Sequence, residues 1–496
     1  MPIRSDRVAG VACSLITCAG AAAGGPGAAT IGPGLSGPAD APGMLGDRGP
    51  AVERVHGCWP GEDGNLTGIV KYLPYQPEAF PAQANSRRMM GLDNRVDLVL
   101  VGDGYTAGDM GVWAQHASNV ENQFFRDEPF TAYEPYFRVT RVDVISNESG
   151  VDNDPSVGVS RDTALDMQYW CGGTERLLCV NTTKARNAAL GGADDVDQIL
   201  AIANSSKYGG AGYTSSNVGT LAGANGSAVE IAIHEMGHSL GDLADEYTYG
   251  GPAAFPGGEP SRANVSILNE TEQLAQQRKW WRWMGDVDGR FDGPVGTYEG
   301  GQYSVTGVYR PSNNSMMRNL FRRFNAPGAE SLIREIYREV SPIDDATPTG
   351  ATIMPGETIS VTPMRPIGHE LAITWAIDGV PDFSLSGLEA IAPEDLNTAP
   401  GTRELTVTVV DPTDMVRDES MRQLFMTETR TWTIEVPCPG GVDVAAPFGE
   451  LDFFDVLGYL ALFDAGDPEA DRTGEGTLDF FDVLDALAAF DLGCEA

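Results

Sequence analysis

Two histidines four residues apart constrain this chain more than any other feature of its sequence. Residues 234–238 read His-Glu-Met-Gly-His. On a helix, residues i and i+4 lie on the same face, so both imidazoles can bind one Zn²⁺ ion. The intervening Glu235 can then act as general base on a metal-activated water. The chain has only five histidines, so this spacing seldom arises by chance, and it predicts a metal-binding helix.

The neighbouring residues predict the limits of this helix at about residues 228 and 240. Ser227 and Glu230 have the spacing of a capping box, which predicts an N-terminus at this point. Gly241 predicts a helix stop at a residue in the left-handed conformation. Apolar residues recur at helical spacing and predict a core-facing stripe of Val229, Ile233, Met236 and Leu240.

Zinc requires a third protein ligand, which the residues after the helix must supply. In the longest form of this motif a histidine stands three residues after the glycine, but here that position is Ala244. The next two residues are Asp245 and Glu246, and a carboxylate suits Zn²⁺. We favour Asp245 and keep Glu246 as the alternative; the other role open to either is a hydrogen bond to a ligating histidine. The candidate metal ligands are therefore His234, His238 and Asp245.

Residues 234–247, with the sequence HEMGHSLGDLADEY, resemble the signature of the IgA-peptidase family of zinc metallopeptidases, a metzincin-like group. Further segments that resemble this family are residues 96–106, 146–150, 208–212 and 307–318. The resemblance covers about residues 95–340, and the zinc segment is its most specific part. It implies a metzincin-like α/β (α+β) catalytic domain and a secreted endopeptidase. The immunoglobulin A substrate of a few members does not transfer to this chain.

The resemblance also implies roles for two residues after the helix. Met317 corresponds to a methionine that packs beneath the metal site, and Met316 is the alternative. An unbranched thioether fills such an irregular space well. Tyr309 could reach the zinc or the oxyanion, as a tyrosine does in some metzincins; the alternative is an exposed or core tyrosine.

The N-terminus has the pattern of a secretory signal peptide at residues 1–23. Arg4 and Arg7 precede an apolar run at 8–16, and small residues follow at 18–23. The apolar run is too short to span a bilayer, and no other run of the chain is long enough. Residues 24–50 are rich in Gly, Pro and Ala and predict a disordered linker. We therefore expect a secreted or extracellular protein, free or attached to a cell surface.

The charge balance excludes some classes of partner. The chain has 33 Lys and Arg against 70 Asp and Glu, for a net charge of −37. Such a surface repels nucleic acid and anionic membranes. It is compatible with calcium, which prefers carboxylate oxygens, although solubility alone accounts for most of the charge.

The chain has seven cysteines, two of which fall within the predicted signal peptide. In an oxidising compartment the spacing of four others suggests two local disulfides, Cys171–Cys179 and Cys438–Cys494. Cys58 is left over. It is either free or part of a different pairing, because sequence does not determine connectivity.

From about residue 342 to residue 436 the pattern changes to short alternating runs separated by turn residues. These runs are residues 358–362, 371–375, 405–410 and 429–434. They predict a small β-sandwich of immunoglobulin type. We find no catalytic constellation in it and expect a spacer or packing module.

The last 60 residues contain an internal repeat. Residues 451–466 recur as residues 478–493, with 12 of the 16 positions identical. Each copy is expected to be a loop followed by a helix, and the pair resembles a dockerin-type repeat. We expect this module to attach the chain to a cell-surface or extracellular partner.

The second copy predicts a calcium site. Residues 471–482 have EF-hand spacing, with Gly476 at the sharp turn. The candidate calcium ligands are Asp471, Thr473, Glu475, Asp479 and Asp482. The first copy has Val444, Ala446 and Phe448 at ligand positions, so we expect Ca²⁺ in the second loop and little or none in the first. The alternative is a two-helix module held by its Phe pairs and the Cys438–Cys494 disulfide.

Together these features predict five parts and two candidate functions. The parts are a signal peptide at 1–23, a linker at 24–50, a zinc metallopeptidase domain at 51–341, a β-sandwich at 342–436 and a dockerin-like module at 437–496. The first function is a secreted zinc-dependent endopeptidase that acts on protein or peptide substrates. The alternative is a non-catalytic extracellular or surface-binding protein with a vestigial peptidase domain. An intact Glu235 favours the first.

Overall fold

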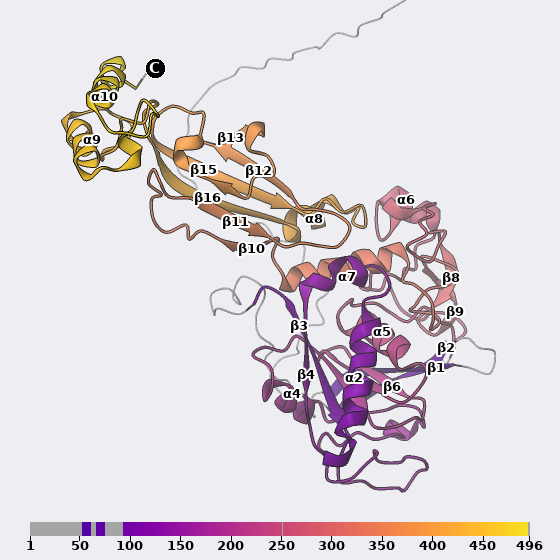
Figure 1. Ribbon diagram of the computed structural model, residues 1–496. Coiled ribbons are helices and arrows are strands. Elements are labelled where there is room, and N and C mark those ends of the chain that lie inside the picture. The colour runs from indigo at the N-terminus through magenta and orange to yellow at the C-terminus, as the bar shows by residue number, and fades with distance from the viewer. Residues whose placement is uncertain (1–51, 61–65, 75–92, 250, 495–496) are drawn as a thin grey trace, which may run out of the picture. The chain divides into compact units, whose positions relative to one another are not determined.

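The computed structural model describes residues 52–60, 66–74, 93–249 and 251–494 (Figure 1). The predicted signal peptide at 1–23 and linker at 24–50 lie outside the described residues. None of the helices in the described part is long and apolar enough to cross a membrane.

The largest sheet has seven strands in the order β2-β1-β6-β7-β5-β3-β4. Neighbours among β7, β5, β3 and β4 run parallel, whereas the pairs β2–β1, β1–β6 and β6–β7 are antiparallel. The strands are β1 (Val52–Pro60), β2 (Leu66–Pro74), β3 (Val96–Asp103), β4 (Phe137–Val142), β5 (Gln198–Ala203), β6 (Gly210–Tyr213) and β7 (Val218–Ala222).

Strand β3 shows why the parallel part of this sheet lies in the interior. All eight of its residues are buried, and its near-continuous apolar run is typical of a strand covered on both faces. Leu98 and Leu100 share a core with helices α2 (Met110–Phe124) and α5 (Ala228–Ser239). Val99 and Val101 share a second core with helix α4 (Thr182–Leu190). Helices therefore cover both faces of the sheet, which confirms the predicted mixed α/β class.

Shorter elements complete the part of the chain that precedes residue 343. They are helices α3 (Phe130–Tyr133), α6 (Glu270–Gln276) and α7 (Ala326–Glu339), and the strands of one hairpin, β8 (Tyr298–Gly301) and β9 (Ser304–Arg310). Asn325 caps α7, because its side-chain oxygen accepts from the Gly328 N–H at 3.0 Å. Cys171 and Cys179 form the first predicted disulfide.

Residues 343–436 form two antiparallel sheets. One has the order β10-β11-β14, with β10 (Ile343–Ala346), β11 (Ile359–Pro363) and β14 (Ala390–Ile391). The other has the order β13-β12-β15-β16, with β12 (Ala372–Ile377), β13 (Val380–Asp382), β15 (Gly401–Val410) and β16 (Thr427–Val436). Helix α8 (Glu419–Phe425) connects β15 to β16. Burial alternates along β11 and β12, as in strands with one covered face. The predicted strands are present, and the assignment to the immunoglobulin type stays a prediction.

One buried carboxylate links these sheets to the part with the seven-stranded sheet. Asp411 follows β15, and its Oδ2 accepts hydrogen bonds from the hydroxyls of Tyr133 and Tyr337, each at 2.7 Å. Nε2 of His369 lies 2.9 Å from Oδ1 of the same residue. The network joins residues that are far apart in the sequence.

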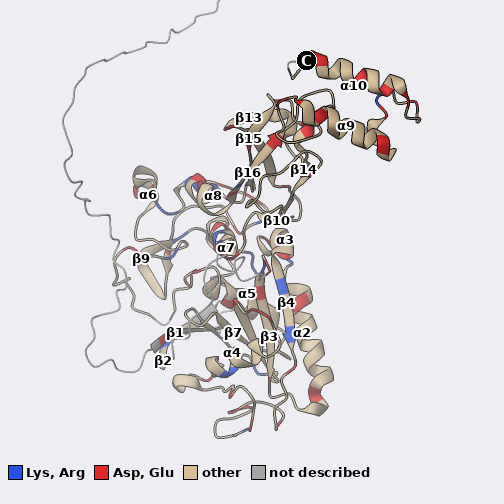
Figure 2. Cartoon of the chain, turned by 90° about the vertical axis from the view of Figure 1, so that its left-hand side faces the viewer, with Lys and Arg blue, Asp and Glu red and all other residues tan. Residues whose placement is uncertain are grey.

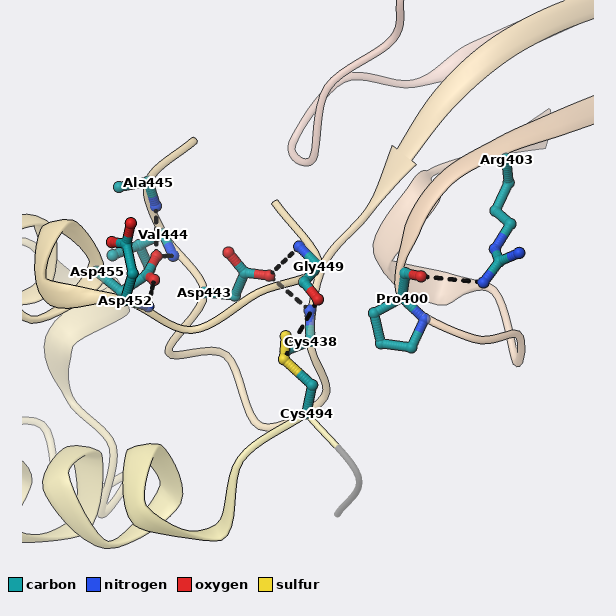
Figure 3. The surroundings of a disulfide bond; sticks show 10 residues. All are labelled: Pro400, Arg403, Cys438, Asp443, Val444, Ala445, Gly449, Asp452, Asp455 and Cys494. Atoms are coloured by element: carbon teal, nitrogen blue, oxygen red, sulfur yellow. Dashed lines mark hydrogen bonds between the residues drawn. A yellow bond between two sulfur atoms is a disulfide. The ribbon is translucent and has the colours of Figure 1, made fainter. Parts of the chain in front are cut away.

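The repeat forms two helices, α9 (Phe453–Ala465) and α10 (Phe480–Leu492). Each begins with an aspartate in a capping box, Asp452 or Asp479. Both helices carry aspartates but no lysine or arginine (Figure 2). Cys438 and Cys494 form the second predicted disulfide, next to the Asp443 carboxylate, which accepts from the Cys438 and Gly449 N–H groups (Figure 3).

Candidate active site

Helix α5 carries the His-Glu-Met-Gly-His segment and is buried on all sides. Eleven of its twelve residues are buried, so the helix has no exposed polar face. The predicted capping box is wrong, because Ser227 makes no side-chain capping hydrogen bond. Glu230 instead accepts from the Arg126 guanidinium and, at 2.9 Å, from the Phe321 N–H. These partners lie far away in the sequence, and the buried carboxylate binds them instead of capping the N-terminus of α5.

The end of α5 also differs from the expectation. The residue in the left-handed conformation is Asp242, with φ of 52°, and not Gly241. Gly241 is needed for a different reason: a Cβ there would lie 2.7 Å from a methyl group of Leu332 on α7 and 2.8 Å from the Gly237 carbonyl. The glycine therefore lets α7 approach the end of α5.

The three predicted metal ligands converge. Oδ1 of Asp245 lies 3.1 Å from Nε2 of His238 and 3.3 Å from Nε2 of His234. All three side chains are at most 1% exposed. Burial alone would raise the pKa of Asp245, but His238 and hydrogen bonds from the surrounding histidines hold that pKa well below its usual range. The carboxylate is therefore anionic, the form that binds a cation.

Backbone carbonyls orient both imidazoles. Nδ1 of His234 lies 2.9 Å from the Met316 carbonyl oxygen, and Nδ1 of His238 lies 2.8 Å from that of Leu243. A carbonyl can only accept, so each Nδ1 carries a hydrogen, and each Nε2 faces the Asp245 carboxylate. Partners of this kind fix the ring orientation of metal-binding histidines.

Met317 packs against α5, as the resemblance implied. A Cβ at Gly237 would overlap its sulfur atom, and Met317 is 1% exposed. Gly237 lies between the two histidines, so the thioether supports the turn of helix that carries them. The alternative, Met316, contributes its carbonyl group instead.

Glu235 lies beside the ligand set with its side chain fully buried. Oε2 has no hydrogen-bond partner, and Oε1 lies 3.6 Å from Sγ of Cys58. Burial raises the pKa of this carboxyl above its ordinary value, against the opposing effect of the two histidines. Gly212 on β6 makes room for Glu235, because any side chain there would collide with Oε2.

Glu246, the alternative third ligand, points into the scaffold. Its carboxylate accepts from the side-chain amides of Asn264 at 2.9 Å and Asn325 at 2.8 Å, and from the Ser315 hydroxyl at 2.6 Å. Burial raises the pKa of Glu246, and these hydrogen bonds oppose that rise. The geometry thus separates the two acidic neighbours: Asp245 faces the histidines, and Glu246 ties together the segments around them.

Three residues at the site were missed by sequence reasoning. The hydroxyl of Tyr303 donates to Oδ2 of Asp245, and Nδ1 of His56 lies 3.1 Å from the same oxygen. Burial lowers the pKa of His56 to about 3 and raises the pKa of Cys58 to about 12. Tyr309, suggested by the resemblance, lies in β9, and its backbone exchanges hydrogen bonds with that of Ser266. Among the described residues, Tyr303 is the tyrosine that hydrogen-bonds to a predicted ligand.

These residues fit a zinc ion. Nε2 of His234 and Oε2 of Glu235 are buried polar atoms without a hydrogen-bond partner, and a buried polar group of this kind costs free energy unless something satisfies it. Two imidazoles and a carboxylate are the ligand types of catalytic zinc sites. Two groups of buried side chains here have ligand atoms within 4.8 Å of one another and could hold a metal ion: His56, His238 and Asp245 in one, and Cys58, His234 and Glu235 in the other.

In the second loop of the C-terminal repeat, two of the predicted calcium ligands bind the loop itself. The Asp471 carboxylate accepts from the N–H groups of Gly474 at 2.8 Å and Gly476 at 2.6 Å. The Asp482 carboxylate accepts from the N–H groups of Thr473 at 3.0 Å and Asp479 at 2.8 Å.

Asp455 plays the same part as Asp482 in the first copy, where it accepts from Val444 and Ala445 (Figure 3). An aspartate therefore closes the loop in each copy, although the N–H donors do not all correspond between the copies, and calcium binding stays a prediction.

A helix that directs two histidines and a glutamate at one point beside a mixed α/β sheet has the arrangement of a metal-dependent peptidase. The family model of IgA Peptidase M64 matches residues 89–289 and 286–336, which together span half of the chain. The chain belongs to this family of metallopeptidases. No curated protein matches the chain. The family match begins after hairpin β1–β2 and ends within α7.

Proposed function

We propose that this chain is a secreted zinc-dependent endopeptidase that hydrolyses peptide bonds in protein substrates. The observation that carries the proposal is the convergence of His234, His238 and Asp245, with Asp245 Oδ1 3.1 and 3.3 Å from the two imidazoles. Three such ligands beside a carboxylate make up a catalytic zinc site. Membership in a metallopeptidase family supports the same reaction.

Bound Zn²⁺ supplies Lewis acidity, which polarises a substrate carbonyl and lowers the pKa of water. Glu235 takes a proton from the attacking water and delivers it to the leaving amine. Its raised pKa suits a group that must both accept and donate a proton. Tyr303 and His56 hold the Asp245 carboxylate in place through its Oδ2.

The alternative is a non-catalytic surface-binding protein that keeps a vestigial peptidase domain. A buried Glu235 with a free Oε2 beside the ligand set favours the enzyme, because a binding module gains nothing from that arrangement. Residues 1–23 and the two disulfides support secretion, and the C-terminal repeat supports attachment to an extracellular partner.

The test exposes the full chain and two variants to zinc, measures the zinc that each retains, and then incubates each with casein. His234→Ala should lose its zinc, measured by atomic absorption after dialysis. Glu235→Gln should keep zinc and lose at least about two orders of magnitude in hydrolysis rate, the scale of general acid–base catalysis. A parent chain that binds no zinc, or a Glu235→Gln variant that cleaves as fast as its parent, contradicts the proposal.

A further inference from the structure

Strand β1 brings two side chains into the candidate site, although hairpin β1–β2 lies outside the segment that matches the family. His56 and Cys58 are two residues apart on this strand and therefore point to the same face. That face is the one toward α5, and the side chains are only 3% and 1% exposed. Both side chains therefore lie against the helix that carries the candidate metal ligands.

The thiol of Cys58 lies among the groups that would surround the metal. One ligand atom each of Cys58, His234 and Glu235 lies within 4.8 Å of the other two. Sγ is 3.6 Å from Oε1 of Glu235, and Nε2 of His234 has no hydrogen-bond partner. A zinc ion held by three protein ligands accepts a fourth, and cysteine sulfur is one of its preferred ligands.

His56 is the other candidate for the fourth position, but it is already engaged. Its Nδ1 lies 3.1 Å from Oδ2 of Asp245 and 3.1 Å from the Tyr303 hydroxyl. Its ring stacks on that of His238, with ring centroids 4.3 Å apart. His56 therefore supports two of the ligands, and Cys58 is the group left for the metal.

Strand β1 also covers the edge of the sheet next to the base. It pairs antiparallel with β6 through Val55–Tyr213 and His56–Gly212, and Gly212 adjoins the carboxylate of Glu235. An exposed sheet edge is a place where an extended peptide can bind as an added strand. Strand β1 occupies this edge of β6.

Close contacts fix β1 in this position. A Cβ at Gly57 would collide with Leu177. The buried Glu53 carboxylate accepts from the Ser216 N–H at 2.7 Å and from the Ser216 hydroxyl at 2.6 Å. These contacts at Glu53 and Gly57 hold the strand beside the site.

We propose that Cys58 is a fourth protein ligand of the metal and that strand β1 thereby keeps the peptidase latent. This inference rests on the proposed zinc site. The sulfur–metal bond forms as the thiol proton leaves to solvent, and it fills the position that a catalytic site keeps open. Loss of the sulfur–metal bond, with His56 still beside Asp245, frees the coordination position and activates the enzyme.

X-ray absorption spectroscopy of the full, zinc-loaded chain tests the ligand directly and needs no variant. We expect one sulfur at about 2.3 Å together with nitrogen and oxygen ligands. Cys58→Ser should retain one zinc per chain and lose the sulfur signal. A wild-type spectrum with only nitrogen and oxygen ligands overturns the inference.

Casein hydrolysis tests latency. Cys58→Ala should raise the rate by at least about tenfold over wild type, because the position used in metal catalysis becomes available. Val55→Ala is the matched control: this residue is buried on the opposite face of the same strand, and its loss should leave the sulfur–zinc bond intact. A Cys58→Ala chain no faster than Val55→Ala overturns the inference.

The two proposals fail in different ways. A chain that binds no zinc refutes the proposed function. A chain that binds zinc through nitrogen and oxygen alone, and whose hydrolysis depends on Glu235, leaves the proposed function standing and refutes only the role of Cys58.

Discussion

The backbone carbonyl of Met316 lies 2.9 Å from Nδ1 of His234, although the two residues are 82 positions apart. Helix α5 therefore does not by itself orient the candidate ligands that it carries. The segment before α7 holds one imidazole through Met316, and the loop after α5 holds the other through Leu243. We expect changes in either segment to alter metal binding without touching a ligand.

Met317→Ala tests the packing of Met317 against α5. The side chain is 1% exposed and its sulfur lies against Gly237, so truncation leaves a cavity beneath the two histidines. We expect a loss of roughly 2–5 kcal/mol in the free energy of unfolding, measured with denaturant. Met317→Leu conserves volume and should cost less than about 1.5 kcal/mol. Equal losses for the two variants would contradict the packing role.

The neighbours Asp245 and Glu246 should give opposite phenotypes. Asp245→Ala removes a ligand and should abolish zinc retention in equilibrium dialysis while the fold persists. Glu246→Ala leaves the donors of Asn264, Asn325 and Ser315 unsatisfied, at about 1–3 kcal/mol each, and should lower the melting temperature. If Glu246→Ala loses more zinc than Asp245→Ala while still folded, Glu246 is the ligand.

Tyr303→Phe tests the support of the third ligand. The change removes only the hydroxyl that donates to Oδ2 of Asp245. Outer partners of metal ligands typically contribute 10–100-fold in affinity, so we expect zinc affinity to fall by about that factor in a chelator competition. Tyr309→Phe is the matched control and should bind zinc as wild type does. Equal affinities for Tyr303→Phe and Tyr309→Phe would contradict the role of Tyr303.

The part of the site that was predictable from sequence is local. The spacing of His234 and His238, and a carboxylate a few residues later, follow from helical periodicity and a short loop. The same local reasoning failed where a distant partner competed. Glu230 was expected to cap its own helix and instead binds Arg126, 104 residues away.

The rest of the site depends on strand pairing that a single sequence does not reveal. Cys58 and His56 reach Glu235 and Asp245 across separations of 177 and 189 residues, because β1 joins the sheet beside β6. A leftover cysteine was the only visible signal, and it suggested a free thiol or a different disulfide. Tyr303 lies in the tight turn between β8 and β9, where no sequence motif marks it.

Asp411 predicts a dependence of stability on pH. Burial would raise its pKa, but hydrogen bonds from His369, Tyr337 and Tyr133 hold the pKa below the ordinary value of 3.8. The stabilisation is therefore complete above that ordinary value and is lost as the pH falls through the lower pKa of the folded state. Asp411→Asn should cost about 1–3 kcal/mol at neutral pH and progressively less in acid below about pH 4. Denaturant unfolding of both chains across this range measures the difference, and a constant gap would contradict the role of the carboxylate.

The last prediction concerns calcium in the loop 471–482. Asp471 and Asp482 already close the loop by accepting from its N–H groups, so the turn that calcium binding needs at Gly476 is formed. Calcium that binds the folded loop should stabilise the C-terminal module by about 2.7 kcal/mol at a hundredfold excess over Kd. Its melting temperature should rise accordingly. Calorimetry of the full chain with and without calcium measures this shift.

The repeat supplies a matched control for the calcium experiment. Asp455 closes the first loop as Asp482 closes the second, but Val444, Ala446 and Phe448 take the place of three of the five candidate ligands there. Asp482→Asn should therefore abolish the calcium-dependent shift, whereas Asp455→Asn should lower the melting temperature of the module and leave the shift intact. The peptidase site uses other residues, so zinc content should not change in either variant. A module whose melting temperature ignores calcium in the wild-type chain would be a two-helix unit held by its core and its disulfide, without a bound ion.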